Sequence, residues 1–338
     1  MVKPTDKLRA LIAVTQPWDE QFFDHELLDQ LKTSYGDVVR VDPIEISPTN
    51  WEDLFQDVRP HAVLTAWDTP SIPNEALPDL GFVAHTGGEV RRLVDRKMIE
   101  EGLLVSNWGE LAAPSVAECA LMLILCSLRQ ITHWTFLMHN DRLWPERGVT
   151  PGQGLFGRRV GLHGFGKIAQ SLVSLLRPFN CQILSYSAGV PAQLFEQHGV
   201  EQVDSVESLF ENSDVLVELE ALTPHTRGSV NESLLRRLPD GAVFVNVGRG
   251  PVVDEAALTK IALEGRLQIA VDVYEVEPLP ATSTLRGLPN VTLLPHVAGP
   301  TMDRRRDCGR RAIDNLHRFA RGERPLGLVT LDVYDRST

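Results

Sequence analysis

The sequence predicts an α/β protein with parallel β-sheets in two domains. Short apolar runs of strand character alternate with helix-like segments twice, first over the N-terminal third and again from Arg159 onward. A chain of 338 residues is too long for one ordinary hydrophobic core, so two domains are expected. With 43% hydrophobic and 23% charged residues, the composition is that of a soluble globular protein.

The first alternating series predicts five short strands and two helices. Alternation of strands and helices indicates βαβ units, which build a parallel sheet. The expected strands are Leu8–Val14, Val38–Val41, Ala62–Ala66, Phe82–Thr86 and Leu103–Asn107. Helices are expected near Asp19–Thr33 and Val90–Glu101.

A long apolar helix is expected between the two series, from about Ser115 to His139. Its start carries a capping signal, because Glu118 follows Ser115 by three positions. Apolar residues are too dense for a single exposed stripe, so the helix should be buried on several sides, either between domains or in a subunit interface. The most apolar part, Val116–Leu128, carries Glu118 and is shorter than the roughly 20 residues that span a bilayer.

The second alternating series is typical of a doubly wound sheet. The expected strands are 159–164, 182–187, 215–219, 242–247, 269–273 and 291–294. The expected helices are 167–177, 231–238 and 255–263, with a final amphipathic helix from about Thr301 to Gly322.

Charge and motif content exclude several classes of function. The formal net charge is −12, so nucleic acid and anionic membranes are not expected partners. The N-terminal apolar run Ala10–Val14 is too short for a signal peptide, and a cytoplasmic location is expected. Four cysteines form no C-x-x-C pair and ten histidines form no H-E-x-x-H pattern, so neither structural disulfides nor a metal site is predicted.

The segment Gly164–Ala169 (GFGKIA) matches a G-x-G-x-x-A dinucleotide fingerprint. It follows a predicted strand and opens a predicted helix, which is the context that binding of a pyrophosphate requires. The next strand commonly ends in an acid that binds the adenosine 2′-hydroxyl, and Ser187 stands there instead. No arginine follows to bind a 2′-phosphate, so NAD is favoured and NADP stays open.

Four polar residues follow predicted strands of the same series. Arg249 follows Ala242–Val247, Asp272 closes the next strand with Glu277 shortly after it, and His296 closes the last strand. Ligands bind at the carboxyl ends of strands in doubly wound sheets, so these side chains can converge on one crevice. Arginine binds carboxylates in a bidentate manner, and a glutamate beside a histidine favours its proton-donating form. Each residue alone also has an ordinary explanation as a surface or loop side chain.

A second glycine pair lies in the first series, at Thr86-Gly87-Gly88. The loop follows a strand and precedes a predicted helix, so its backbone amides can meet an anion at a helix start. An ordinary tight turn is the alternative.

Together these motifs resemble the D-isomer-specific 2-hydroxyacid dehydrogenase family, which includes phosphoglycerate dehydrogenases and glyoxylate/hydroxypyruvate reductases. The resemblance is weak over the first 80 residues and strong from Val105 to Arg321. It is carried by 116–118 (VAE), 160–169, 222–228 (LTPHTRG), 246–250 (NVGRG), 253–258 (VDEAAL), 272–278 and 295–299 (PHVAG).

The resemblance implies a role for each matching residue. Arg249 corresponds to the arginine that binds the substrate carboxylate and polarises its carbonyl, Glu277 to the acid that supports the histidine, and His296 to the general acid/base. Gly87 and Gly88 correspond to the loop that takes the substrate carboxylate. Asp272 corresponds to the residue that holds the nicotinamide carboxamide. The full set of implied cofactor contacts is Gly164, Phe165, Gly166, Lys167, Ile168, Ser187, Thr226, Val247, Gly248 and Asp272.

The resemblance also implies a domain arrangement and an activity. Residues 1–107 and 300–338 would form a flavodoxin-like substrate domain, into which a Rossmann domain for NAD(P), residues 108–299, is inserted. The chain would interconvert a small-molecule 2-oxoacid and its D-2-hydroxyacid, as a homodimer. A dinucleotide-sensing regulatory protein without turnover is the alternative. Departures from the family pattern are Ser187, Ala169, and Leu219 and Ala221 in place of a histidine and a proline.

Overall fold

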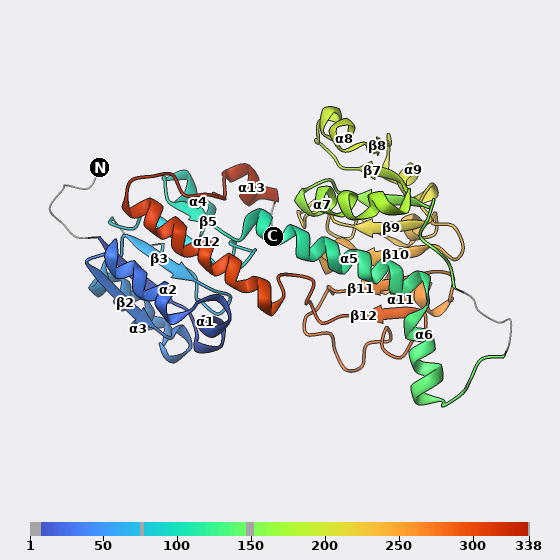
Figure 1. The fold of residues 1–338 in the computed structure, drawn as a ribbon, viewed down its shortest axis with the longest axis horizontal. Helices are drawn as coiled ribbons and strands as arrows, with labels where there is room; N and C mark the ends of the chain where they lie inside the picture. Colours follow the sequence, from blue (N-terminus) through green and yellow to red (C-terminus); the bar gives the residue numbers. More distant parts are fainter. Residues whose placement is uncertain (1–7, 75–77, 147–151, 337–338) are drawn as a thin grey trace. The chain divides into compact units, whose positions relative to one another are not determined.

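The computed structural model describes residues 8–74, 78–146 and 152–336. The chain divides into two compact units (Figure 1). The first unit combines residues 1–112 with 300–338, and the second comprises residues 113–299. The second unit is therefore an insertion between two segments of the first.

A five-stranded parallel sheet forms the centre of the first unit. Its strands are β1 (Arg9–Ala13), β2 (Asp37–Val41), β3 (Ala62–Thr65), β4 (Phe82–His85) and β5 (Leu104–Ser106). They lie in the order β2-β1-β3-β4-β5, which is the flavodoxin-like doubly wound order. All five predicted strands are confirmed to within two residues at either end.

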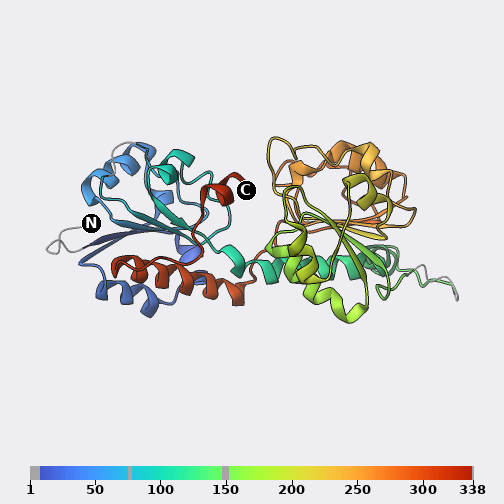
Figure 2. The ribbon, with the colours of Figure 1, turned by 90° about the horizontal axis from the view of Figure 1, so that it is seen from above.

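Helices cover both faces of this sheet (Figure 2). One face packs against α1 (Gln16–Phe22), α2 (His25–Asp29) and α12 (Met302–Ala320), and the other against α3 (Pro48–Val58), α4 (Arg96–Glu100) and α13 (Leu331–Arg336). The helix predicted over 19–33 is in fact three short pieces, α1, α2 and the 3₁₀ turn Gln30–Thr33. Phe23 interrupts it with extended backbone.

The second unit contains a seven-stranded parallel sheet. Its strands are β6 (Arg159–His163), β7 (Gln182–Tyr186), β8 (Glu201–Gln202), β9 (Val215–Glu218), β10 (Val243–Asn246), β11 (Gln268–Val271) and β12 (Val291–Leu293). The order β12-β11-β10-β9-β6-β7-β8 places β6, which precedes the glycine fingerprint, at the point where the winding reverses. The prediction of two doubly wound α/β sheets is confirmed.

Helices again form one layer on each face of the sheet (Figure 2). Helices α5 (Ala113–Leu128) and α7 (Lys167–Leu176) belong to one apolar core, together with part of α8 (Ala192–His198). Helices α9 (Val206–Glu211), α10 (Glu232–Leu235) and α11 (Glu255–Leu263) belong to the other.

The long helix predicted over 115–139 is broken. Helix α5 ends at Leu128, Gln130 adopts a left-handed backbone with φ 52°, and α6 (Ile131–Thr135) and a π-helical turn (Phe136–Asn140) follow. Left-handed backbone cannot continue an α-helix, so the apolar pattern runs across two separate helices.

Helix α5 and the turn before it form a 20-residue apolar stretch, Gly109–Leu128, that is long enough to cross a membrane by length and composition alone. The most apolar part, Val116–Leu128, is shorter than this stretch, because the helical segment begins earlier, at Gly109. About half of this stretch is buried inside the protein, and α5 contributes eight buried residues, mostly to the core that it shares with α7. These contacts are those of a core helix.

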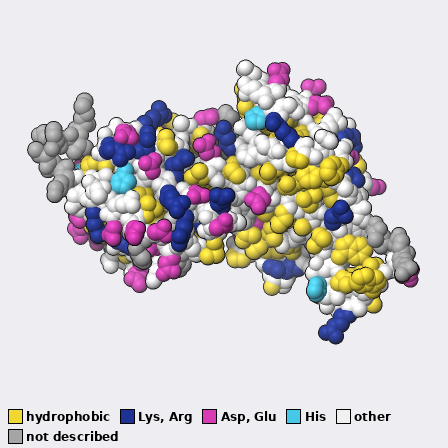
Figure 3. All heavy atoms as spheres, viewed as in Figure 1, with side chains coloured by type: hydrophobic (Ala, Val, Ile, Leu, Met, Phe, Trp, Pro, Cys, Tyr) yellow, Lys and Arg dark blue, Asp and Glu magenta, His cyan; other side chains and the backbone are white. Residues whose placement is uncertain are grey.

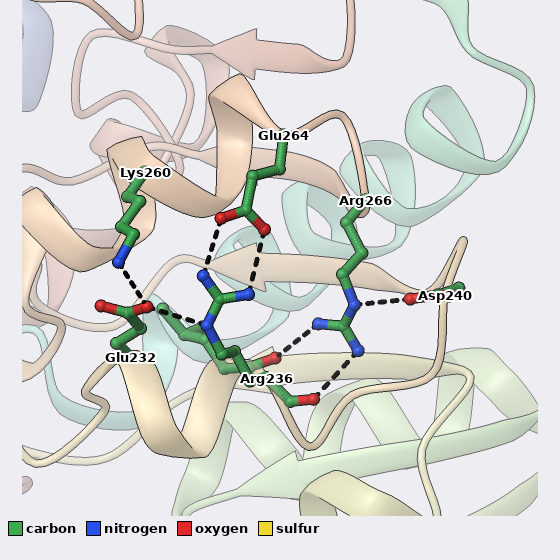
Figure 4. A network of polar contacts seen from close by, with 7 residues as sticks. Glu232, Arg236, Asp240, Lys260, Glu264 and Arg266 are labelled. Carbon is green, nitrogen blue, oxygen red and sulfur yellow. Dashed lines mark hydrogen bonds and ion pairs between the residues drawn. The ribbon is translucent and has the colours of Figure 1, made fainter.

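A network of charged side chains lies on the outer surface of α10 and α11 (Figure 4). Arg236 contacts Glu264 through both terminal nitrogens, at 2.7 and 3.0 Å, and Glu232 through Nε at 2.8 Å. Lys260 also reaches Glu232, at 2.8 Å. Because these groups are exposed, the network adds little stability and weakens with salt.

The packing of α12 gives a sharp stability test at Gly309. An alanine in mid-helix normally stabilises a helix by about 1 kcal/mol relative to glycine. A Cβ on Gly309, however, would lie 1.9 Å from the carbonyl oxygen of Phe22. We expect Gly309→Ala to lower the free energy of unfolding by about 1–3 kcal/mol in urea unfolding, because the backbones must separate.

Gly154→Ala is the matched control, since a Cβ there meets nothing within 4 Å. It should be neutral or slightly stabilising, within about 1 kcal/mol. Stabilisation by Gly309→Ala would contradict the close approach of α12 to Phe22.

Candidate active site

Arg249 follows strand β10 in a turn that the Asn246 side chain shapes. Asn246 accepts a hydrogen bond from the Gly248 amide at 3.0 Å and donates one to the Arg249 carbonyl at 3.3 Å. The Arg249 side chain is half-buried and donates to the Gly248 carbonyl at 2.8 Å. A Cβ on Gly250 would lie 1.9 Å from the Tyr274 carbonyl oxygen, so this glycine is required by backbone packing.

Asp272 follows strand β11 and holds the loop that carries His296. Its carboxylate, only 1% exposed, accepts hydrogen bonds from the amides of Val297 at 2.8 Å and Ala298 at 2.9 Å. Its backbone carbonyl accepts a third, from the His296 amide at 2.8 Å. His296 has a left-handed backbone, φ 56°, which costs a non-glycine residue free energy and persists only where surrounding contacts impose it.

Glu277 and His296 form a hydrogen-bonded pair. Nδ1 of His296 lies 2.6 Å from Oε2 of Glu277, while Oε1 accepts from the Tyr274 amide at 2.9 Å. The carboxylate is therefore fixed by backbone on one side and orients the imidazole on the other. With Nδ1 engaged, Nε2 is the ring nitrogen left to exchange a proton with a substrate.

Tyr274 joins the two loops and was not selected from the sequence. Its hydroxyl donates to the Leu294 carbonyl at 2.7 Å, which ties the segment after β11 to the end of β12. Burial raises the pKa of this phenol to about 12, so it stays a neutral donor. Only its place between Asp272 and Glu277 could have drawn attention to it.

The fingerprint loop fits a dinucleotide pyrophosphate. Gly164 has φ +99°, and a Cβ there would lie 2.8 Å from the backbone of Leu219. A Cβ on Gly166 would meet nothing within 4 Å, so the approach to the ten-residue helix α7 is open. Gly166 is the N-cap and supplies no side-chain cap, so the first amides of α7 can bind an anion. Ala169 is fully buried, as helix packing at this position requires.

The other fingerprint side chains do not all face a ligand. The Phe165 ring is buried and stacks on Phe195 at 4.5 Å, so Phe165 can offer a cofactor only its backbone. Ile168 packs against the core and Lys167 is exposed. Thr226 shapes its own turn, since its hydroxyl donates to the Ala221 carbonyl at 2.6 Å.

A buried charged pair was not predicted. It lies at the ends of β6 and β9, immediately before the fingerprint in the case of β6. Nδ1 of His163 is 2.5 Å from Oε2 of Glu218, and both side chains are buried. Burial alone lowers the pKa of His163, but the Coulombic attraction and hydrogen bond of Glu218 outweigh it and raise the pKa. The second carboxylate oxygen of Glu218 accepts the Glu220 amide at 2.8 Å, and Glu220 in turn accepts from the Ser187 hydroxyl at 2.8 Å.

The loop at Gly87 and Gly88, in the first unit, is not a helix start. It is followed by a turn in which the amides of Leu93 and Val94 donate to the Val90 carbonyl, and α4 begins only at Arg96. The expectation that this loop opens a helix is therefore wrong. The Gly87 carbonyl accepts the amide of Trp108 at 3.1 Å.

Aromatic side chains crowd this loop. A Cβ on Gly87 would lie 2.5 Å from Nε2 of His85 and 2.8 Å from Nε1 of Trp67, and one on Gly88 2.5 Å from Nε1 of Trp108. Burial lowers the pKa of His85 to about 4, so it is neutral at physiological pH, and its Nε2 has no hydrogen-bond partner among the described residues. Arg305 lies over the Trp67 ring at 5.7 Å.

Three further side chains with the chemistry to contact a substrate have other surroundings. Arg91 donates to the Tyr334 carbonyl at 3.0 Å and lies over its ring. Arg92 is exposed and pairs with Glu89, and Trp144 is 82% exposed. In the described part of the chain, no group of three or more His, Cys, Asp or Glu side chains has the geometry of a metal site.

A doubly wound sheet with a dinucleotide fingerprint, an arginine and a carboxylate–histidine pair is the arrangement of a nicotinamide-dependent oxidoreductase. The profile of the D-isomer-specific 2-hydroxyacid dehydrogenase NAD-binding domain matches residues 121–298. A glyoxylate reductase from Thermococcus kodakarensis is 31% identical over 292 residues, which cover 83% of this chain and 87% of the relative. The chain belongs to the D-isomer-specific 2-hydroxyacid dehydrogenase family and is an NAD(P)-dependent enzyme of that kind.

Two further similarities agree with this assignment. A D-3-phosphoglycerate dehydrogenase from Methanocaldococcus jannaschii is 28% identical over 284 residues, 83% of this chain but only 54% of that protein. The crystal structure of an NADPH-dependent glyoxylate/hydroxypyruvate reductase from Sinorhizobium meliloti superposes with a TM-score of 0.75 and 25% identity, covering 98% of this chain and all of that one.

The His163–Glu218 pair allows a test of whether its two buried side chains compensate each other. Removing one member leaves the other buried and uncompensated, whereas replacing both with apolar side chains removes the need for compensation. We expect His163→Leu to lower the free energy of unfolding by about 3–5 kcal/mol and the double variant His163→Leu/Glu218→Leu to recover most of that loss. Urea unfolding followed by circular dichroism measures both. Equal losses in the single and double variants would show that the two side chains do not compensate each other.

Proposed function

We propose that this chain reduces a small 2-oxoacid to its D-2-hydroxyacid, and catalyses the reverse reaction, with the second unit binding the dinucleotide and the first unit binding the substrate. The observation that carries the proposal is the Glu277–His296 pair, held at 2.6 Å on a loop fixed by Asp272. A dinucleotide-sensing protein requires no proton relay, so this pair favours catalysis over the regulatory alternative.

The proposed mechanism assigns substrate binding to Arg249 and to the Gly87–Gly88 amides. The guanidinium binds the substrate carboxylate and polarises the neighbouring carbonyl, which stabilises the negative charge that develops on its oxygen. Half-burial strengthens this interaction relative to water.

Proton transfer is assigned to Nε2 of His296. When bound, the nicotinamide supplies the hydride to the carbonyl carbon. His296 donates its proton to the carbonyl oxygen in reduction and accepts it in oxidation, and Glu277 stabilises the imidazolium through Nδ1. Asp272 is proposed to hold the nicotinamide carboxamide while keeping the His296 loop in place.

We also propose that the protein is a cytoplasmic homodimer built around α5 and α6. Several large apolar side chains on and after these helices are exposed in the single chain: Met122, Ile131, Met138, Leu143 and Trp144. Hydrophobic side chains gather over α5 and α6 on the face seen in Figure 3. Exposed apolar surface of this kind is typical of a subunit interface.

The proposal is tested by the absorbance of NADH and NADPH at ~340 nm with a panel of 2-oxoacids. We expect oxidation with at least one small 2-oxoacid. His296→Ala should lower kcat by about 10²–10⁴-fold through loss of the proton donor, and Arg249→Ala should lower kcat and raise KM together.

His317→Ala is the matched histidine control, because His317 contacts Ser34 in the first unit and has no proposed role. It should retain turnover. Binding of a dinucleotide without oxidation by any 2-oxoacid would contradict the enzymatic proposal and support the sensing alternative.

A further inference from the structure

The position that normally distinguishes NAD from NADP is neutral in this chain. Ser187 stands directly after β7, where an acid commonly binds the ribose hydroxyls of the adenosine. A serine hydroxyl can hydrogen-bond a ribose, but it carries no charge that repels a 2′-phosphate. The structure nevertheless places a carboxylate at this position, supplied by a different strand.

That carboxylate belongs to Glu220, two residues beyond the end of β9. Its Oε1 accepts a hydrogen bond from the Ser187 hydroxyl at 2.8 Å. Strands β9, β6 and β7 are neighbours in the sheet, so their carboxyl ends meet at one edge. Ser187 and Glu220 together place a carboxylate there, held by the serine hydroxyl, where a single aspartate would otherwise supply the carboxylate.

The backbone of Glu220 is held against the fingerprint. A Cβ on Gly164 would lie 2.9 Å from the Glu220 nitrogen, which shows how closely the two loops pack. The same nitrogen donates to Oε1 of Glu218 at 2.8 Å. Because His163 compensates the charge of Glu218, this anchor is stable in the protein interior. Glu220 itself is only half-buried, so its carboxylate is accessible to a ligand.

The stretch of chain that contains Ser187 and Glu220 has no positively charged side chain for a phosphate. From residue 178 to residue 226 the sequence contains eight acidic residues and no lysine or arginine. This stretch includes β7 and β8, which lie on one side of the fingerprint strand β6, and β9, which lies on its other side. A 2′-phosphate beside Ser187 would therefore meet the Glu220 carboxylate, and no lysine or arginine of this stretch could bind it.

We propose that Glu220, anchored by Ser187, is the residue that binds the adenosine ribose hydroxyls and makes this chain select NAD over NADP. The inference rests on the proposed function of the second unit as the dinucleotide-binding unit. A carboxylate accepts hydrogen bonds from the 2′- and 3′-hydroxyls and repels a phosphate at the same place, so one group supplies both affinity and discrimination.

Isothermal titration calorimetry with NADH and NADPH tests the proposal without relying on turnover. We expect the wild type to bind NADH about 100-fold more tightly than NADPH, and Glu220→Gln to reduce this ratio to about tenfold or less. Glu196→Gln removes the same charge from an exposed position on α8 and should leave the ratio unchanged. Titration with ADP-ribose should show the same loss of affinity in Glu220→Gln, since the ribose and not the nicotinamide is recognised.

A rescue variant separates recognition from folding. Ser187→Asp in the Glu220→Gln background returns an acid to the end of β7 and should restore the preference for NADH. An unchanged ratio in Glu220→Gln, or a wild type that prefers NADPH, would overturn the inference and leave the proposed function intact. A wild type that binds neither dinucleotide would overturn both.

Discussion

The candidate site depends on the interaction of Asp272 with three consecutive backbone amides. The side chain and the carbonyl of this one residue accept hydrogen bonds from His296, Val297 and Ala298. A buried carboxylate is costly unless it is hydrogen-bonded, and amides in a strained loop are equally in need of acceptors. Each therefore stabilises the other, and the left-handed conformation of His296 is the result. That conformation sets where the imidazole meets Glu277.

Much of this arrangement could be predicted from the sequence, because its causes are local. Strands β10, β11 and β12 read clearly as apolar runs, and a parallel sheet brings residues that follow neighbouring strands to one edge. The positions of Arg249, Asp272 and His296 follow from that rule alone. Their proposed roles come from the family resemblance.

The misjudged features arise from contacts between distant parts of the chain or from single backbone conformations. His163 and Glu218 are 55 residues apart, and the local sequence around either residue does not predict that they pair. The left-handed backbone at Gln130 ends α5 within a continuous apolar pattern that hydrophobic periodicity cannot resolve. Likewise, the residues after Gly88 have the composition of a helix. The amides of Leu93 and Val94, however, donate to the Val90 carbonyl in a turn, and α4 begins only at Arg96.

The most direct test of the account is the configuration of the product formed from a prochiral substrate. Pyruvate or a longer 2-oxoacid is suitable, whereas glyoxylate gives an achiral product. After incubation with NADH, the hydroxyacid is separated on a chiral column. The account predicts the D-enantiomer alone, because in the proposed mechanism Arg249 and His296 fix one face of the carbonyl toward the hydride donor. Formation of the L-enantiomer or of a racemate would contradict it.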